Sequence, residues 1–371
     1  MKNALGSHLF DSTYFIAYEA VGQYTAHTIW HMLQDAGLSN EKFQHGLSLS
    51  EILQHLQCHH RYEHHVAWAL YFLKAKQYLT WNEDQWMTLP SPLPFFDKKT
   101  ISETVPSHFN IQPSIDLIDY VAKHWISIIQ NNVKAEHILF HHEGLSLWEH
   151  YFSNDHHLYA VHNYGTAEYV FSNLHETATP IHMLELGVGF GSATSAMLQS
   201  AITYAKPIDQ YTITDVSPAL ANKVKKHFAL QYPSVSFTSR KFDIEHSTPK
   251  WSHTFDYIYA VNVMHCAEQI VDTLANMQAL LKEDGMLVLS ECVRQDHQVQ
   301  LHQEFIFSLL PHFRLLPKQQ DTIDHTIPCY GFWSGEDWKY FMEQAGYIDI
   351  HVHVNAGSSV CGAIISGKKK V

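Results

Sequence analysis

The chain is poor in cysteine, poor in basic residues and free of long apolar runs, and each shortage excludes a class of protein. Its 371 residues include an odd number of cysteines and no C-x-x-C pair, which disfavours a disulfide framework and predicts a reducing, cytoplasmic location. The five are Cys58, Cys266, Cys292, Cys329 and Cys361. No run approaches the ~18 apolar residues of a membrane span, and residues 1–10 lack the apolar stretch of a signal peptide, so no membrane association is expected.

Positive charge is also scarce, because 24 basic residues face 37 acidic ones and the formal net charge is −13. Such a chain repels nucleic acid phosphate, so no nucleic acid partner is expected. The 30 histidines suggest a metal site at first sight. The densest group is Cys58, His59, His60, His64 and His65, in which His60 and His64 lie one helical turn apart. No second ligand pair with zinc spacing appears elsewhere, so no metal is predicted.

The most informative stretch is residues 183–191, which read MLELGVGFG. An apolar strand ends in Gly187, Gly189 and Gly191, and a helix-forming stretch follows. Such a turn lets backbone approach a ligand, and the next helix N-terminus favours an anionic group. The third glycine comes too early for a dinucleotide fingerprint. With Glu185 before it, the run resembles motif I of the S-adenosylmethionine (SAM) methyltransferases, which implies SAM as cofactor.

The following strands supply the other expected cofactor contacts. Residues 211–214 form a strand that ends in Asp215, and an acidic residue roughly 20 residues beyond such a loop is placed to accept both ribose hydroxyls. The strand at 235–242 ends in Asp243 and Ile244, placed to meet an adenine. Asn262, at the end of the fourth strand, completes the predicted cofactor-binding set.

Strands alternate with helices over the carboxyl-terminal part, which predicts a doubly wound, parallel α/β sheet. We expect seven strands, the last two being 347–354 and 360–366, with the final strand returning antiparallel. Residues 146–371 should form this domain. Residues 1–145 differ: helix-like stretches at 22–38, 47–56 and 62–78 precede a hairpin around residues 82–84. This pattern suggests a mainly helical, winged-helix-like lid or substrate domain.

The expected chemistry lies at two neighbouring strand ends, where the fourth strand runs out at His265 and the fifth at Glu291. In a doubly wound sheet, ligands lie beyond the carboxyl ends of the strands. A histidine held by a carboxylate is a general base with a fixed tautomer. A plain strand cap at His265 and a loop start at Glu291 are the alternative reading of these two positions.

Five ordered stretches look like the C-methyltransferase domains of reducing polyketide synthases. They are Tyr211–Pro218 (YTITDVSP), Asp243–Glu245 (DIE), Phe255–His265 (FDYIYAVNVMH), Ala279–Glu291 (ALLKEDGMLVLSE) and Trp338–Gly346 (WKYFMEQAG). The resemblance implies methylation of the α-carbon of a β-ketoacyl chain on an acyl carrier protein. It also implies a catalytic dyad of His265 and Glu291.

The resemblance is strongest over residues 180–292 and weakest over the predicted substrate-side insertion, 292–337. The family's tryptophan pair and Arg-rich stretch are missing there, and Phe305, Phe307 and residues 330–333 (YGFW) stand instead. Two alternatives therefore stay open. One is a small-molecule O- or N-methyltransferase, and the other is a non-catalytic SAM-fold protein that binds a partner. The sequence leaves the oligomeric state open.

Overall fold

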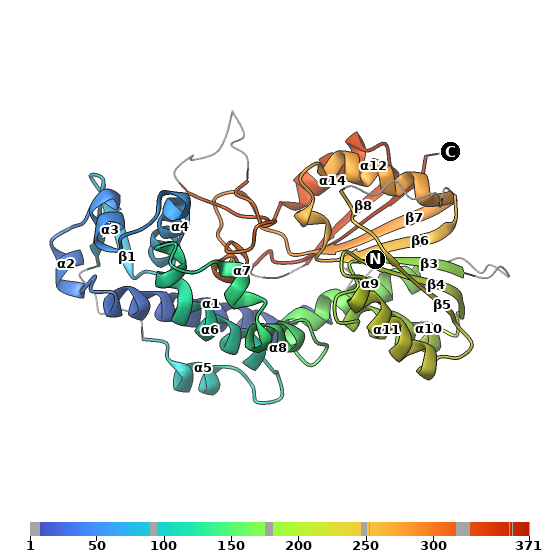
Figure 1. Ribbon diagram of the computed structural model, residues 1–371, viewed down its shortest axis with the longest axis horizontal. Helices are drawn as coiled ribbons and strands as arrows, with labels where there is room; N and C mark the ends of the chain where they lie inside the picture. Colours follow the sequence, from blue (N-terminus) through green and yellow to red (C-terminus); the bar gives the residue numbers. More distant parts are fainter. Residues whose placement is uncertain are drawn as a thin grey trace.

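The computed structural model describes residues 8–89, 95–174, 181–245, 251, 253–316, 327–355, 357 and 359–370. A helical amino-terminal part lies beside a part built around a large sheet, and the segment after β7 lies between them (Figure 1). None of the helices described is both long enough and apolar enough to cross a membrane.

The amino-terminal part consists of helices and one hairpin. Asp11 caps the first helix by accepting a hydrogen bond from the backbone N–H of Tyr14, and Ser48 and Glu51 form a capping box at the third. The elements are α1 (Ser12–Asp35), α2 (Asn40–Gln44), α3 (Leu49–His55), η1 (His60–Tyr62), α4 (Glu63–Ala75), β1 (Leu79–Asn82), β2 (Gln85–Thr88), α5 (Lys98–Thr104), α6 (Gln112–Ile129), α7 (Ala135–Leu139) and α8 (His142–Tyr151).

The predicted hairpin is present, and its turn residues Glu83 and Asp84 have φ values of 48° and 62°. Positive φ at both central residues matches the twist of a tight hairpin. The first helix begins at residue 12 and not at residue 22, because the Asp11 cap and the buried Tyr14 and Tyr18 extend it. The winged-helix-like character of this part stays a prediction.

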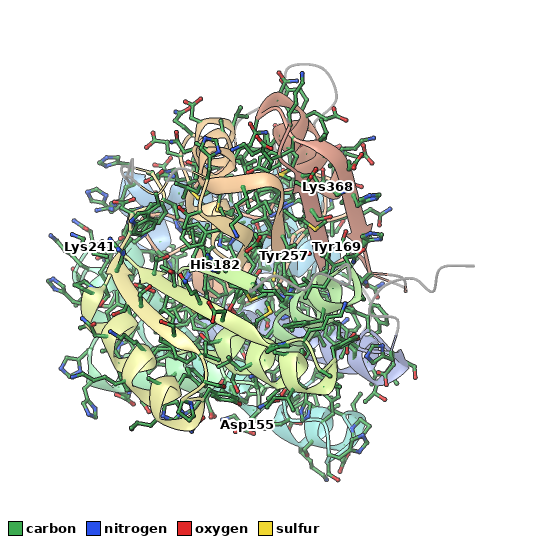
Figure 2. The ribbon with its side chains drawn as sticks, turned by 90° about the vertical axis from the view of Figure 1, so that its right-hand side faces the viewer. Asp155, Tyr169, His182, Lys241, Tyr257 and Lys368 are labelled. Carbon is green, nitrogen blue, oxygen red and sulfur yellow. The ribbon has the colours of Figure 1, made fainter. Side chains whose placement is uncertain are left out.

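The sheet has seven strands in the order β5-β4-β3-β6-β7-β9-β8. They are β3 (Ile181–Leu186), β4 (Ile208–Asp215), β5 (Ser236–Lys241), β6 (Phe255–Val261), β7 (Leu281–Glu291), β8 (Ile348–Val354) and β9 (Ala363–Lys368). β9 runs antiparallel to β7 and β8, and the other neighbours are parallel. The view in Figure 2 crosses this sheet from Lys241 on β5, past His182 and Tyr257, to Lys368 on β9. The predicted doubly wound sheet with an antiparallel return strand is confirmed.

Helices cover both faces of the sheet (Figure 1). The side chains of β3 alternate between two cores: Met183 packs with α9, α10 and α11, while Leu184 and Leu186 pack with α12 and α14. The helices of this part are α9 (His157–Ser172), α10 (Ser192–Thr203), α11 (Pro218–Gln231), η2 (Met264–Cys266), α12 (Ile270–Leu280), α13 (Glu304–Phe307) and α14 (Gly335–Gln344).

A third core joins the amino-terminal helices to the segment that follows β7. Phe305, Phe313 and Phe332 of that segment belong to the same buried cluster as the helices α1 to α8. The division of the chain into two domains stays a proposal. The packing favours a boundary between α8 and α9, because residue 145 lies inside α8, whose buried Trp148 and Tyr151 pack in the amino-terminal core.

Candidate active site

The glycine loop between β3 and α10 is held in a conformation that suits glycine. Gly187, Gly189 and Gly191 have φ values of 64°, 52° and 89°. A Cβ on Gly187 would lie 2.6 Å from the Val263 side chain, whereas a Cβ on Gly189 would meet no atom within 4 Å. The loop therefore packs tightly at its start and leaves open space in its middle, where a ligand can approach the backbone.

Asp215, at the end of β4, is bonded to this loop. Its Oδ2 accepts a hydrogen bond of 3.0 Å from the backbone N–H of Gly189, and its Oδ1 accepts one of 2.8 Å from Ser217. Each carboxylate oxygen keeps further acceptor capacity. The end of β5 is tied to the same residue, because the N–H of Phe242 donates to the Asp215 carbonyl at 3.0 Å.

Glu185 lies in the middle of a buried polar cluster and is almost inaccessible to solvent. Its Oε2 accepts hydrogen bonds from the Thr194 hydroxyl at 2.7 Å and from the Tyr211 hydroxyl at 2.9 Å, and the Tyr259 hydroxyl contacts that of Tyr211. Burial raises the pKa of Glu185 to about 7, although the hydroxyl donors lower it. The carboxyl group therefore changes charge near neutral pH.

A pocket of about 150 Å³ lies in front of the glycine loop. It brings together four residues predicted from the sequence, Glu185, Gly187, Gly189 and Asn262. Asn262 donates and accepts through its backbone and Oδ1, but its buried Nδ2 has no partner among the described residues. An unpartnered buried donor in a pocket wall fits a ligand with acceptor atoms.

The remaining predicted cofactor residues, Gly191, Asp215, Asp243 and Ile244, do not line this pocket. Asp243 and Ile244 follow β5, next to Asp215, and Ile244 is buried. The sequence reasoning missed Phe152 and Tyr159, which reach the pocket from the α8–α9 region.

His265 and Glu291 are in direct contact at the ends of the adjacent strands β6 and β7. His265 Nδ1 lies 2.6 Å from Glu291 Oε2. Glu291 Oε1 accepts hydrogen bonds from the backbone N–H groups of Val263 at 3.2 Å and Met264 at 2.8 Å. The carboxylate is fully buried and held at three points, so it fixes the orientation of the imidazole.

The environment of His265 makes it a stronger base than an exposed histidine. Burial by itself lowers the pKa of His265, but the neighbouring Cys266 and the Glu291 carboxylate outweigh that effect and raise it well above its usual value. Glu291 engages Nδ1, which leaves Nε2 as the second ring nitrogen. It is the atom available to take a proton.

Aromatic rings from the segment after β7 enclose the imidazole. The ring centroids of Phe313 and Phe332 lie 5.6 Å and 5.4 Å from that of His265, and Phe307 packs against both. The sequence pointed to Phe332 but not to Phe313. Trp333 packs against Phe341, and Phe305 packs against tryptophans of the amino-terminal core.

A second pocket, of about 290 Å³, lies beside His265. His265 forms one wall, and Arg314, Trp333 and Phe341 form others. His265 thus faces this pocket, while Asn262 and Val263, just before it, face the pocket at the glycine loop.

Among the described residues, no group of three or more His, Cys, Asp or Glu side chains is arranged to hold a metal ion. His65, from the densest histidine cluster, instead links α4 to the segment after β7. Its Nε2 bonds the carbonyl of Ser308 at 2.9 Å, and its Nδ1 lies 3.3 Å from the Tyr330 hydroxyl.

Residues 184–287, from within β3 to within β7, match the family model described as a methyltransferase domain. Over this range the chain is similar to methyltransferase domains. The matched range includes the glycine loop and His265, while Glu291 follows four residues after it. The predicted enzyme class, a SAM-dependent methyltransferase, is confirmed by this match.

The relatives that this chain resembles include polyketide synthases. Polyketide synthase PksR of Bacillus subtilis (strain 168) is 26% identical over 255 residues, which cover 64% of this chain and 9% of the relative. The chain thus spans a small fraction of that protein's length. The predicted resemblance to polyketide synthase domains is confirmed.

Two solved structures share the fold over nearly the whole chain. The DszA carbon methyltransferase superposes with a TM-score of 0.74 at 20% identity, covering 95% of this chain and 90% of that one. The CMeT domain of the citrinin polyketide synthase gives 0.72 at 18% identity, covering 94% and 89%. The predicted class I methyltransferase fold is therefore confirmed, with the amino-terminal part included in the match.

Proposed function

We propose that this methyltransferase transfers a methyl group from SAM to the α-carbon of a β-ketoacyl thioester, with His265 as general base. The observation that carries the proposal is the buried 2.6 Å contact between His265 Nδ1 and Glu291 Oε2. His265 lines one pocket, and Asn262 and Val263, just before it in the chain, line the pocket at the glycine loop. The likeness to polyketide synthases and to carbon methyltransferases in fold supports the choice of carbon as the acceptor.

The proton chemistry follows from the dyad. Glu291 holds the Nδ1–H, so Nε2 removes a proton from the α-carbon, whose acidity the two flanking carbonyl groups raise. The electron pair of the broken C–H bond delocalises into an enolate, and the proton stays on Nε2. Glu291 then stabilises the imidazolium. The enolate carbon is the nucleophile that accepts the methyl group.

The residues at the glycine loop fit SAM, which supplies an electrophilic methyl group when it is bound. Open space beside Gly189 admits the ligand, and Asp215 has acceptor capacity for ribose hydroxyls. Asp243 and Ile244 stand at the adenine position. Glu185 and the unpartnered Nδ2 of Asn262 serve the methionine moiety.

We assign the amino-terminal part and the segment after β7 to the substrate side. They share one core, and the rings of Phe313 and Phe332 keep water from the enolate. An acyl carrier protein is the proposed donor of the thioester. Of the three lysines on α11 that would offer it positive charge, Lys223 lies 3.8 Å from Glu149. This pairing leaves Lys225 and Lys226 as the proposed contacts.

Deuterium exchange tests the carbon-acid step apart from methyl transfer. An acetoacetyl thioester incubated with the protein in deuterated water should exchange its α-protons, and adding SAM should give the α-methyl product. The His265→Ala variant should do neither. Methyl transfer to hydroxyl or amine acceptors with the thioester untouched would replace this proposal with an O- or N-methyltransferase.

A further inference from the structure

The segment after β7 contains an ion pair that is completely buried. The side chains of Arg294 and Glu304 have no solvent exposure, and Arg294 Nη2 lies 2.9 Å from Glu304 Oε1. A buried ion pair of this kind is weak evidence for stability, because well-packed apolar residues often replace it without loss. Its value lies in fixing one arrangement of the groups that it contacts.

The guanidinium of Arg294 gathers three backbone carbonyls as well as the carboxylate. Its Nε donates to Phe332 at 2.5 Å, its Nη1 to Val299 at 2.6 Å, and its Nη2 to Tyr330 at 2.8 Å. Glu304 in turn accepts from the N–H groups of Leu301 at 2.6 Å and Tyr330 at 2.5 Å. The pair therefore ties residues 299–304 to residues 330–332.

One of these carbonyls belongs to a residue that contacts the dyad. The ring of Phe332 lies 5.4 Å from the His265 ring and 4.7 Å from that of Phe313, which also contacts His265. Holding the Phe332 backbone fixes where its ring can stand. Among the described residues, no hydrogen bond or ion pair joins Arg294 to His265 or Glu291, so it acts on them through Phe332.

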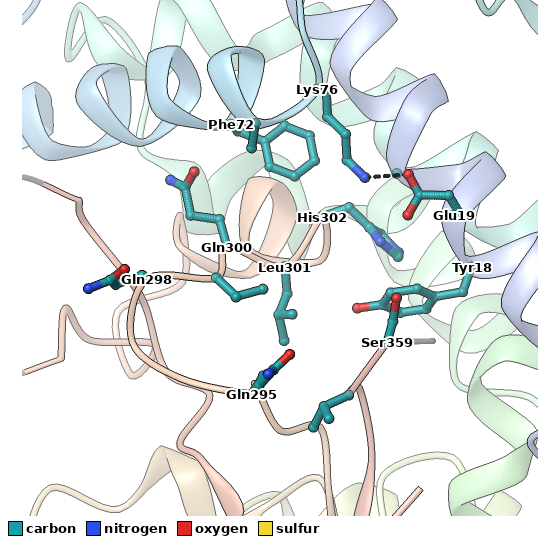
Figure 3. A pocket seen from close by; sticks show the side chains of 14 residues that line it. Tyr18, Glu19, Phe72, Lys76, Gln295, Gln298, Gln300, Leu301, His302 and Ser359 are labelled. Atoms are coloured by element: carbon teal, nitrogen blue, oxygen red, sulfur yellow. Dashed lines mark hydrogen bonds and ion pairs between the residues drawn. The ribbon is translucent and has the colours of Figure 1, made fainter. Parts of the chain in front are cut away.

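The other end of the pair faces the amino-terminal helices. Val299 and Leu301, which the pair holds, line a pocket of about 280 Å³ that Tyr18 and Lys76 close from α1 and from the end of α4 (Figure 3). The Lys76–Glu19 ion pair, at 2.7 Å, lies in the same wall. The buried pair thus stands between the amino-terminal part and the catalytic dyad.

We propose that Arg294 and Glu304 are a positioning pair, which holds the Phe332 ring against His265. The ring then excludes water from His265 and keeps the imidazole oriented toward the substrate. This inference rests on the proposed role of His265 as general base. It adds that Arg294 and Glu304 influence His265 although neither residue contacts the substrate.

The decisive variant is Arg294→Lys, which keeps the charge beside Glu304 but cannot span three carbonyls with one ammonium group. We expect α-proton exchange to fall roughly 10- to 100-fold, because a small misplacement of reacting groups costs up to about that much. SAM affinity, measured by calorimetry, should stay at the wild-type value, since the glycine-loop pocket holds none of these residues.

Phe332→Leu should lower α-proton exchange by a similar factor. This variant also tests the positioning role if Arg294→Lys does not fold. In the double variant Arg294→Lys/Phe332→Leu the exchange rate should be no lower than in the worse single variant, because both changes act on one contact. The matched control is Lys282→Met, which removes the partly buried Lys282–Asp256 pair, 2.8 Å, at the opposite end of the sheet. This control should exchange as the wild type does.

A titration of the His265 ring by NMR separates this inference from the proposed function, since it needs no substrate. The His265 signal is identified by its absence in His265→Ala. Both Arg294→Lys and Phe332→Leu should raise the His265 pKa, because water entering beside the ring relieves the desolvation that lowers it. The charged or titratable groups that face the ring, Glu291 and Cys266, and Arg314 bonded to the Cys266 carbonyl, stay in place.

Two results would overturn the inference. One is an Arg294→Lys protein with a lower melting temperature but wild-type exchange and an unchanged His265 titration. The other is a Phe332→Leu protein in which both readouts are unchanged. A wild-type protein that exchanges nothing would refute the proposed function, and the titration would still decide whether the pair acts on His265.

Discussion

On the β3–β5 side of the sheet, most of the proposed cofactor residues follow the ends of three successive strands. On the β6–β7 side, rings from a separate segment cover the dyad. Asp215 reaches back to Gly189 over 3.0 Å within one βαβ unit. His265 depends on Phe313 and Phe332, which a buried ion pair and the amino-terminal core hold in place. The comparison teaches that the contact between Gly189 and Asp215 depends on neighbouring strands, whereas the surroundings of the proposed base depend on segments far away in the chain.

The largest expected effect is a loss of turnover with no loss of SAM binding, which would show that the β6–β7 side and the β3–β5 side act independently. His265→Ala should lower turnover about 10²- to 10⁴-fold, the range for a positioned general base, while SAM binds as before. Single-turnover kinetics and calorimetry measure the two quantities. An equal loss of SAM affinity would show that the two sides are not independent.

Asp215→Ala tests the β3–β5 side, where the expected effect is on SAM affinity. It removes the acceptor that holds the Gly189 N–H, together with the proposed ribose contact. Hydrogen bonds to a charged group contribute about 1.5–3 kcal/mol, so SAM affinity should fall roughly 10- to 100-fold. Asp349→Ala, at an exposed ion pair on β8, is the control. Unchanged SAM binding in Asp215→Ala would place the ribose elsewhere.

Glu291→Gln should cost less turnover than His265→Ala, because the amide keeps the shape but not the charge that stabilises the imidazolium. The raised pKa of His265 means that wild-type activity is lost as pH falls through that pKa, since only the neutral ring takes a proton. Removing the carboxylate lowers the pKa, so the acid limb of the pH–rate profile should move to lower pH. The Phe332→Leu variant should move the acid limb to higher pH, because its His265 pKa is expected to rise.

The double variant His265→Ala/Glu291→Gln sharpens the same point. Residues that act as a unit are non-additive, so this protein should be little slower than His265→Ala alone. If the turnover losses of the two single variants multiplied in the double variant, Glu291 would act independently of His265.

The smallest expected effect concerns Glu185 on the cofactor side. Because its pKa is about 7, SAM affinity should weaken modestly as pH falls through neutrality and the carboxylate takes up a proton. Glu185→Gln should flatten this dependence, as calorimetry at several pH values would show. A wild-type affinity that is constant from pH 6 to pH 8 would contradict a contact between Glu185 and a cationic part of SAM.

Local sequence determined the sheet, its return strand, the glycine loop and the positions of His265 and Glu291. Alternation of strand and helix patterns fixes a parallel sheet, and in such a sheet the ends of neighbouring strands must meet. The turn chemistry of Glu83 and Asp84 fixed the hairpin in the same way. These features were predictable because each depends on residues close together in the chain.

Only the tertiary structure decided which side chains surround the dyad. Phe313 has no local pattern that marks it, and the partnership of Arg294 with Glu304 and three carbonyls depends on a fold-back of the chain. The start of α1 at Ser12 and the entry of Phe152 and Tyr159 into the cofactor pocket depend likewise on packing against distant segments. Periodicity reports which face of an element is buried, but not what buries it, because that partner is chosen by the packing of the whole core.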